Sequence, residues 1–132
     1  MNPTTSNNTK VLVVEDEPFI SELYVRALKA EGYEVKVTPN GDQALKDAQT
    51  NAFDIILLDI MVPNMTGTEI LRRLRDSQLT PQLKAKIIVT TNLELSDEGR
   101  SAIESQADGY IVKAEVTPKE LVKFLGQLQL NS

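Results

Sequence analysis

The chain has 132 residues, of which 41% are hydrophobic, and this is enough for one domain with an ordinary core that needs no disulfide or structural metal. It contains no cysteine and no histidine, which excludes thiolate chemistry, cysteine-bound zinc, a phosphohistidine donor and a serine–histidine hydrolase. A formal net charge of -5 argues against direct binding to nucleic acid, and no apolar run reaches the length of a membrane span. We therefore expect a cytoplasmic protein with no direct contact to nucleic acid or to a membrane.

The chain begins with polar residues 1–9, which we expect to form a disordered tail before one domain over residues 10–130. Lys10–Val14 is a continuous run of β-prone residues and predicts a strand. Pro18 suits the first turn of a helix, and Gly32 is typical of the position where such a helix ends. The first predicted unit is therefore a strand followed by a helix.

The middle of the chain repeats this strand–helix pattern. Glu34–Thr38 alternates like an edge strand, and Gly41–Thr50 carries its apolar residues on one helical face. Phe53–Asp59 is the most apolar run in the chain and predicts a strand buried on both faces. Thr66 and Glu69 have the spacing of a capping box, which predicts the start of a third helix.

Two further strand–helix units complete the chain. Ile87–Thr90 predicts another buried strand, and Ser96–Gln106 predicts a helix with few apolar residues. Tyr110–Val112 predicts the last strand. Thr117 and Glu120 form a second capping box, which predicts the start of the final helix.

Strands that alternate with helices pair in parallel through right-handed crossovers. The five units predict an α/β fold, a doubly wound (βα)5 domain with a five-stranded parallel sheet in the flavodoxin-like order 2-1-3-4-5. The order of the strands reverses between the first and the third, and ligands bind at the carboxyl ends of strands near such a point. The residues that follow these strand ends are therefore candidates for a functional site.

Polar residues stand at four of these strand ends. Glu15 and Asp16 follow the first strand, Asp59 ends the third, Thr91 ends the fourth and Lys113 follows the fifth. Converging carboxylates repel one another unless one is protonated or a cation lies between them, and oxygen ligands suit Mg2+, with Mn2+ as an alternative. Together with Lys113, such a cation would attract a phosphoryl group that Asp59 could accept as a nucleophile.

Each of these residues has an ordinary structural explanation when it is taken alone. A single Asp at a strand end commonly caps a turn or a helix, a single Lys is commonly solvated, and Thr is favoured in strands. The combination at four neighbouring strand ends favours a shared functional site over separate structural roles.

Over about residues 10–128, the chain resembles the receiver domain of bacterial two-component response regulators. Each matching segment is short and weak by itself, but their order and spacing together are specific. The segments that carry the resemblance are Val11–Pro18, Ile56–Pro63 with Met65–Gly67, Ile87–Thr91, and Ala107–Lys113.

The resemblance implies a role for each residue at the strand ends. Asp59 would be the phosphoacceptor. Asp16 would bind the metal directly together with Asp59, Glu15 would bind it through water, and the backbone carbonyl of Met61 would be a further ligand. These residues would make phosphorylation of Asp59 dependent on Mg2+.

The resemblance also implies a switch and a set of partners. Lys113 would pair with the phosphoryl group, Thr91 would be the switch hydroxyl, and Tyr110 would be the aromatic residue that follows it inward. The phosphoryl donor would be a phosphohistidine on a sensor histidine kinase or a histidine phosphotransfer protein, and the output would be an unidentified protein target. We expect a monomeric, stand-alone receiver that is a phosphoacceptor rather than an enzyme and that assists only its own phosphorylation and slow dephosphorylation.

Three residues depart from the pattern of the family. Glu15 stands where many receivers have Asp, and Asn92 stands where Ala or Gly is usual. Ala114 replaces a proline that usually follows the lysine in a cis peptide, and a cis bond before a residue other than proline costs about 2.5–4 kcal/mol. Either the chain bears this cost, or its last loop takes another path and aims Lys113 differently.

Three alternative functions follow from these observations. The departures at Asn92 and Ala114 keep open a non-phosphorylated pseudo-receiver that acts as a docking module. A flavin binder of the same topology would need a phosphate cradle after the first strand, where this chain has acidic residues. A phosphohydrolase with an aspartyl nucleophile commonly has a second Asp two residues later, where this chain has Met61.

Overall fold

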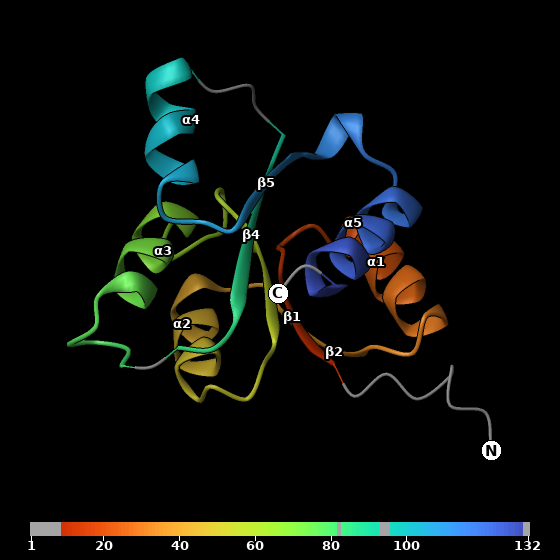
Figure 1. Ribbon diagram of the computed structural model, residues 1–132, viewed down its shortest axis with the longest axis horizontal. Coiled ribbons are helices and arrows are strands. Elements are labelled where there is room, and N and C mark those ends of the chain that lie inside the picture. Colours follow the sequence, from red (N-terminus) through yellow and green to blue (C-terminus); the bar gives the residue numbers. More distant parts are fainter. Residues whose placement is uncertain (1–8, 82, 93–95, 131–132) are drawn as a thin grey trace.

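The computed structural model describes residues 9–81, 83–92 and 96–130, in which five strands alternate with five α-helices (Figure 1). A short 3-10 helix, Lys113–Glu115, follows the last strand. The strands are β1 (Lys10–Val14), β2 (Glu34–Thr38), β3 (Ile55–Asp59), β4 (Lys86–Thr91) and β5 (Gly109–Val112). The helices are α1 (Pro18–Ala30), α2 (Gly41–Gln49), α3 (Gly67–Arg75), α4 (Asp97–Glu104) and α5 (Pro118–Leu130).

The strands form one parallel sheet in the order β2-β1-β3-β4-β5, which confirms the predicted topology. Thr9 is the last residue of the expected tail and the only one within the described part of the chain, and its carbonyl accepts a hydrogen bond from the Glu34 N–H (3.0 Å). Because β1 and β3 are neighbours, with Val14 opposite Leu58, the residues after these two strands emerge side by side.

Helices cover both faces of the sheet (Figure 1). Alternate residues of β3 point to opposite faces, so Ile56 and Leu58 pack in one core cluster and Ile55 and Leu57 in the other. The first cluster includes apolar residues of α2, α3 and α4, and the second includes those of α1 and α5. This two-sided burial explains why β3 is apolar throughout rather than alternating.

The two predicted capping boxes differ in the structure. At the start of α5 the box is complete, because the Thr117 N–H donates to the Glu120 carboxylate (2.9 Å) and the Glu120 N–H donates to the Thr117 hydroxyl (3.1 Å). At the start of α3 the Thr66 hydroxyl accepts from the Glu69 N–H (3.2 Å), which is half of the expected box.

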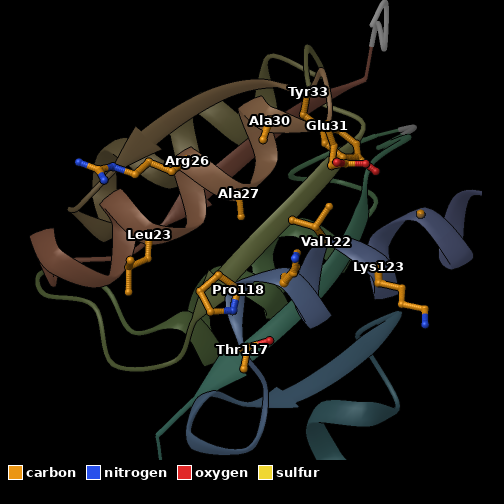
Figure 2. Close-up of a pocket in the computed structure, with 12 residues that line it drawn as sticks. Leu23, Arg26, Ala27, Ala30, Glu31, Tyr33, Thr117, Pro118, Val122 and Lys123 are labelled. Atoms are coloured by element: carbon orange, nitrogen blue, oxygen red, sulfur yellow. The ribbon is translucent and has the colours of Figure 1, made fainter. Parts of the chain in front are cut away.

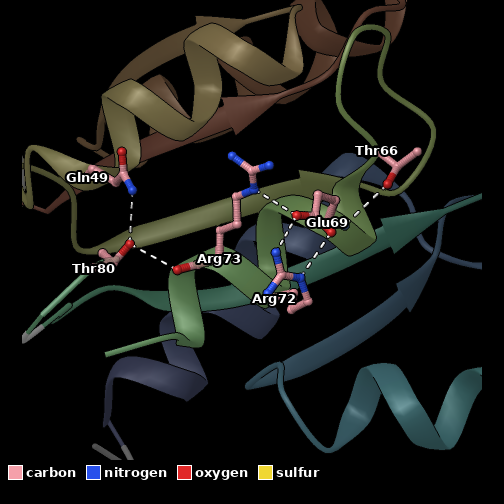
Figure 3. A network of polar contacts seen from close by, with 6 residues as sticks. All are labelled: Gln49, Thr66, Glu69, Arg72, Arg73 and Thr80. Atoms are coloured by element: carbon pink, nitrogen blue, oxygen red, sulfur yellow. Dashed lines mark hydrogen bonds and ion pairs between the residues drawn. The ribbon is translucent and has the colours of Figure 1, made fainter. Parts of the chain in front are cut away.

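In the described part of the chain the Glu69 carboxylate bonds forward to two arginines of α3 instead of completing the box (Figure 3). Arg72 approaches it to 2.6 Å and Arg73 to 2.7 Å. Hydrogen bonds from Arg72 and then Arg73 lower the pKa of Glu69 to about 2. The basic stretch on α3 is therefore partly neutralised within its own helix.

A buried threonine ties the ends of α2 and α3 together (Figure 3). The Thr80 hydroxyl donates to the backbone carbonyl of Arg73 (3.1 Å) and accepts from the side-chain amide of Gln49 (3.2 Å). This contact anchors the long connection between α3 and β4.

Two glycines hold the loop that follows Asp59. The Gly67 N–H donates to the Ile60 carbonyl (2.8 Å), and the Gly41 N–H donates to the Pro63 carbonyl (2.9 Å). A Cβ on Gly67 would lie 2.4 Å from the backbone oxygen of Asp59, and a Cβ on Gly41 would lie 2.1 Å from the backbone oxygen of Met65. Only glycine fits at these two close approaches, so both residues fix the backbone beside Asp59.

We expect Gly67→Ala to lower the free energy of unfolding by about 1–3 kcal/mol, because the new methyl group must displace backbone atoms at Asp59 and Ile60. Urea unfolding followed by circular dichroism measures this change. The control is Gly126→Ala in α5, where a Cβ would meet nothing within 4 Å and where alanine should raise the stability by about 0.5–1 kcal/mol. A Gly67→Ala variant as stable as the wild type would contradict the close approach.

Candidate functional site

Three carboxylates meet at the carboxyl edge of the sheet. Glu15 and Asp16 follow β1 and Asp59 ends β3, and one ligand oxygen from each lies within 4.8 Å of the others. Glu15 and Asp59 are buried, whereas Asp16 is exposed. The structure thus brings together the acidic residues that the predicted strand order placed at this edge, and it leaves one side of the cluster open to solvent.

Lys113 lies between the two buried carboxylates. Its Nζ donates to Asp59 Oδ2 (2.7 Å) and also to Glu15 Oε1. The side chains of Lys113, Glu15 and Asp59 are only 5%, 1% and 6% exposed, so these contacts lie out of bulk water. The ammonium group therefore offsets part of the repulsion between Glu15 and Asp59.

The path of the chain after Lys113 resolves the alternatives left open by Ala114. The described residues contain no cis peptide bond, so the Lys113–Ala114 bond is trans. The chain turns directly into the 3-10 helix Lys113–Glu115, and Lys113 still reaches Asp59. The last loop therefore takes another path without removing its lysine from the site.

Burial and charge act in opposite directions on the pKa values of Glu15 and Lys113. Burial raises the pKa of Glu15, and the hydrogen bond and positive charge of Lys113 oppose that effect only in part. Burial by itself would lower the pKa of Lys113, but the bonds to Asp59 and Glu15 outweigh it and the pKa is raised. Lys113 is therefore held as a cation beside the Asp59 carboxylate.

Each oxygen of Asp59 has a different partner. Oδ1 accepts a hydrogen bond from the Met61 N–H (2.9 Å), and Oδ2 accepts from Lys113 (2.7 Å). The Met61 side chain points to solvent, with 63% of the residue exposed. The family resemblance implied only a carbonyl role for Met61, and its N–H contact with Asp59 follows from the turn of the loop immediately after β3.

Thr91 and Tyr110 lie on the same face of neighbouring strands. Val89 is opposite Tyr110 and Thr91 is opposite Val112, so the alternation of the strands directs Thr91 to the face on which Val89 and Tyr110 pack. Thr90 is directed to the other face of β4. Thr91 is 1% exposed at the end of β4, and Asn92 follows it at the exposed start of the next loop.

Tyr110 makes one contact that the sequence did not indicate. The guanidinium carbon of Arg100 in α4 lies 4.9 Å from the centre of the Tyr110 ring, within the range of a cation–π interaction. The Tyr110 hydroxyl is buried and has no hydrogen-bond partner among the described residues. Arg100 and Tyr110 belong to different elements, α4 and β5, which the fold brings together. The spacing of residues along the sequence could therefore not have predicted this contact.

The family model of the response regulator receiver domain matches residues 11–125. The chain belongs to the response regulator receiver domain family, a module of two-component signal transduction. The described residues contain no helix long and apolar enough to cross a membrane.

Individual proteins agree with this assignment. The chain is 39% identical over 121 residues to the response regulator ArlR of Staphylococcus saprophyticus, which covers 92% of this chain and 51% of ArlR. It is 36% identical over 117 residues to the transcriptional regulatory protein ResD of Bacillus subtilis, which covers 89% of this chain and 46% of ResD. The chain thus spans about half the length of these curated relatives.

Solved structures show the same fold. The Vibrio cholerae chemotaxis protein CheY4 matches with a TM-score of 0.76 and 32% identity, covering 92% of this chain and 98% of CheY4. The receiver domain of the sensor histidine kinase PA1611 from Pseudomonas aeruginosa matches with a TM-score of 0.77 and 25% identity, covering 92% and 97%. That domain has a magnesium ion coordinated in its active site cleft.

We expect Lys113→Met to raise the pKa of Glu15, because the substitution removes the hydrogen bond and the positive charge that oppose the effect of burial. Carboxyl carbon NMR, recorded as a function of pH without added metal, measures this pKa. Lys10→Met is the control, since Lys10 lies on an exposed surface beside Glu34. An unchanged Glu15 titration in Lys113→Met would show that the ammonium does not stabilise the carboxylate.

Proposed function

We propose that Asp59 accepts a phosphoryl group from a phosphohistidine donor and that this reaction depends on Mg2+. The observation that carries the proposal is the position of the Asp59 carboxylate. It is buried at the edge of the sheet, where it accepts hydrogen bonds from Lys113 and from the Met61 N–H. Both contacts orient the carboxylate, and phosphoryl transfer depends mainly on such alignment and on charge neutralisation.

The donor set fits a hard divalent cation. Its three carboxylates offer only oxygen atoms, within 4.8 Å of one another, and the exposed Asp16 leaves an approach from solvent. Asp16, Asp59 and the Met61 carbonyl would hold Mg2+, with Glu15 acting through water and Mn2+ as a substitute. The ion would neutralise negative charge on the carboxylates and on the incoming phosphoryl oxygens.

The residues of the chain supply the rest of the chemistry. An Asp59 oxygen attacks phosphorus while the phosphorus–nitrogen bond of the phosphohistidine breaks, so the phosphoryl group moves and the imidazole leaves with its electron pair. Lys113 already contacts Asp59 Oδ2 and is placed to neutralise an oxygen of the new acyl phosphate. The chain would assist this transfer and a slow hydrolysis, without turnover of other substrates.

We further propose that Thr91 and Tyr110 report the phosphorylation. The added phosphoryl group brings negative charge and acceptor oxygens beside the end of β4, where the Thr91 hydroxyl can donate to it. A shift of Thr91 changes the packing on the face that it shares with Tyr110. Movement of the Tyr110 ring would then alter the surface near α4 for a downstream protein.

The proposed phosphodonor is a sensor histidine kinase or a histidine phosphotransfer protein. The chain itself has no histidine and cannot supply the phosphohistidine. Similarity to the receiver domain of a sensor histidine kinase and to the chemotaxis protein CheY4 supports the class of partner. We propose that the receiver acts as a monomer.

Incubation with acetyl phosphate and Mg2+ tests this function. We expect intact-mass spectrometry to show the gain of one phosphoryl group in the wild type and no gain in Asp59→Asn. Asp16→Asn should lose most of the Mg2+-dependent mass gain, because the substitution removes one of the proposed direct ligands of the ion. The control is Asp42→Asn, which removes an exposed acid in the first turn of α2.

Two results would contradict the proposal. One is a mass gain that persists in Asp59→Asn, and the other is the absence of any Mg2+-dependent gain in the folded wild type. The second result would favour the non-phosphorylated docking module.

A further inference from the structure

A groove of ≈ 850 Å³ runs between α1 and α5, on the face of the sheet opposite α2, α3 and α4 (Figure 2). Its apolar lining includes Leu23 and Ala27 from α1 and Val122 from α5. Leu23 lines this groove and is 37% exposed. The groove therefore presents apolar surface that the fold itself does not cover.

Small residues keep the groove open. Ala27 and Ala30 offer only methyl groups from α1, and Gly126 offers no side chain from α5. A Cβ placed on Gly126 would meet nothing within 4 Å. A glycine inside a helix costs about 0.5–1 kcal/mol relative to alanine, and here no close packing requires it. The missing side chain leaves room for one from another molecule.

The charged lining of the groove is basic, although the chain as a whole carries -5. Arg26, Lys119 and Lys123 supply three positive charges and Glu31 supplies one negative charge, so the lining sums to 3 − 1 = +2. Arg26 already pairs with Glu22 at 2.8 Å. Among the described residues Lys119 and Lys123 form no ion pair within 4.0 Å. Hydrogen bonding to Thr117, and after it the charge of Lys123, lowers the pKa of the exposed Glu120. Neither ammonium group is nonetheless held by a direct carboxylate contact that an acidic ligand would have to displace.

We propose that this groove docks an acidic amphipathic helix of a partner protein. Apolar side chains spaced along one helical face would enter between α1 and α5, and flanking Glu or Asp residues would pair with Lys119 and Lys123. None of the residues Glu15, Asp16, Asp59, Thr91 and Lys113 lines the groove. The proposal therefore does not rest on phosphorylation of Asp59.

A second copy of this chain matches the groove less well than a partner does. Among the described helices α4 carries an exposed acidic surface, with Asp97, Glu98 and Glu104. Its large apolar residue, Ile103, is buried in the core of its own domain and cannot enter a groove on another molecule. A partner helix with both acidic and exposed apolar residues would match both the basic and the apolar residues that line the groove.

The experiment uses the full chain and a synthetic helical peptide of about four turns as the probe. The peptide carries leucines at positions i, i+3 or i+4, and i+7, with glutamates beside them, and a matched peptide carries lysines in place of the glutamates. We expect saturable amide shifts in 15N-labelled protein, confined to α1 and α5, with the acidic peptide alone. Equal binding of both peptides, no saturable binding, or shifts centred on another surface would overturn the proposal.

Two variants test the charge and the shape of the groove. Lys123→Glu should weaken binding of the acidic peptide at least about tenfold, whereas Lys46→Glu, an equal charge change on the exposed side of α2, should leave it unchanged. Gly126→Leu should fill the groove and abolish binding while circular dichroism and phosphorylation by acetyl phosphate stay as in the wild type.

The proposal is wrong if Lys123→Glu and Lys46→Glu bind the peptide alike, or if folded Gly126→Leu binds as the wild type does. Sedimentation of the chain without peptide provides a further check. A concentration-dependent dimer whose amide shifts map to the groove would assign this face to a second copy and overturn the proposal.

Discussion

The contact of one ammonium group with two buried carboxylates organises the functional end of this molecule. Lys113 donates to both Glu15 and Asp59, which come from β1 and β3. Without a nearby positive charge, two carboxylates at this depth would repel each other. The strand order matters because it makes β1 and β3 neighbours. Lys113 follows β5, which is separated from β3 by β4, and its side chain extends to the two carboxylates.

The backbone around Lys113, Glu15 and Asp59 is fixed, and this holds their charged groups in place. All residues of β3 are buried, and Gly67 and Gly41 hold the following loop at distances that admit no side chain. The Met61 N–H then fixes one oxygen of Asp59 while Lys113 fixes the other. The exposed Asp16 completes the acidic set at the solvent side, so the site combines a fixed Asp59 carboxylate with an open approach.

The fold and the positions of the site residues could be predicted because both follow from local patterns. Runs such as Phe53–Asp59 set the strands, and the parallel order placed their polar ends at one edge. Contacts that depend on side-chain reach could not be predicted. Glu69 bonds to Arg72 and Arg73 rather than completing a capping box, the lysine after β5 is shared by two acids, and Arg100 lies over Tyr110. These contacts depend on distances in the folded chain, which the spacing of residues along the sequence does not give.

The most direct test of this account is to locate the phosphoryl group chemically. Borohydride reduces an aspartyl phosphate to homoserine, and peptide sequencing by mass spectrometry then identifies the altered position. After treatment with a phosphodonor and Mg2+, we expect homoserine at Asp59 and at no other acidic residue. Reduction products at Glu15 or Asp16, or none at Asp59 in a protein that has gained a phosphoryl group, would contradict the role of Lys113 and its two carboxylates in preparing one acceptor.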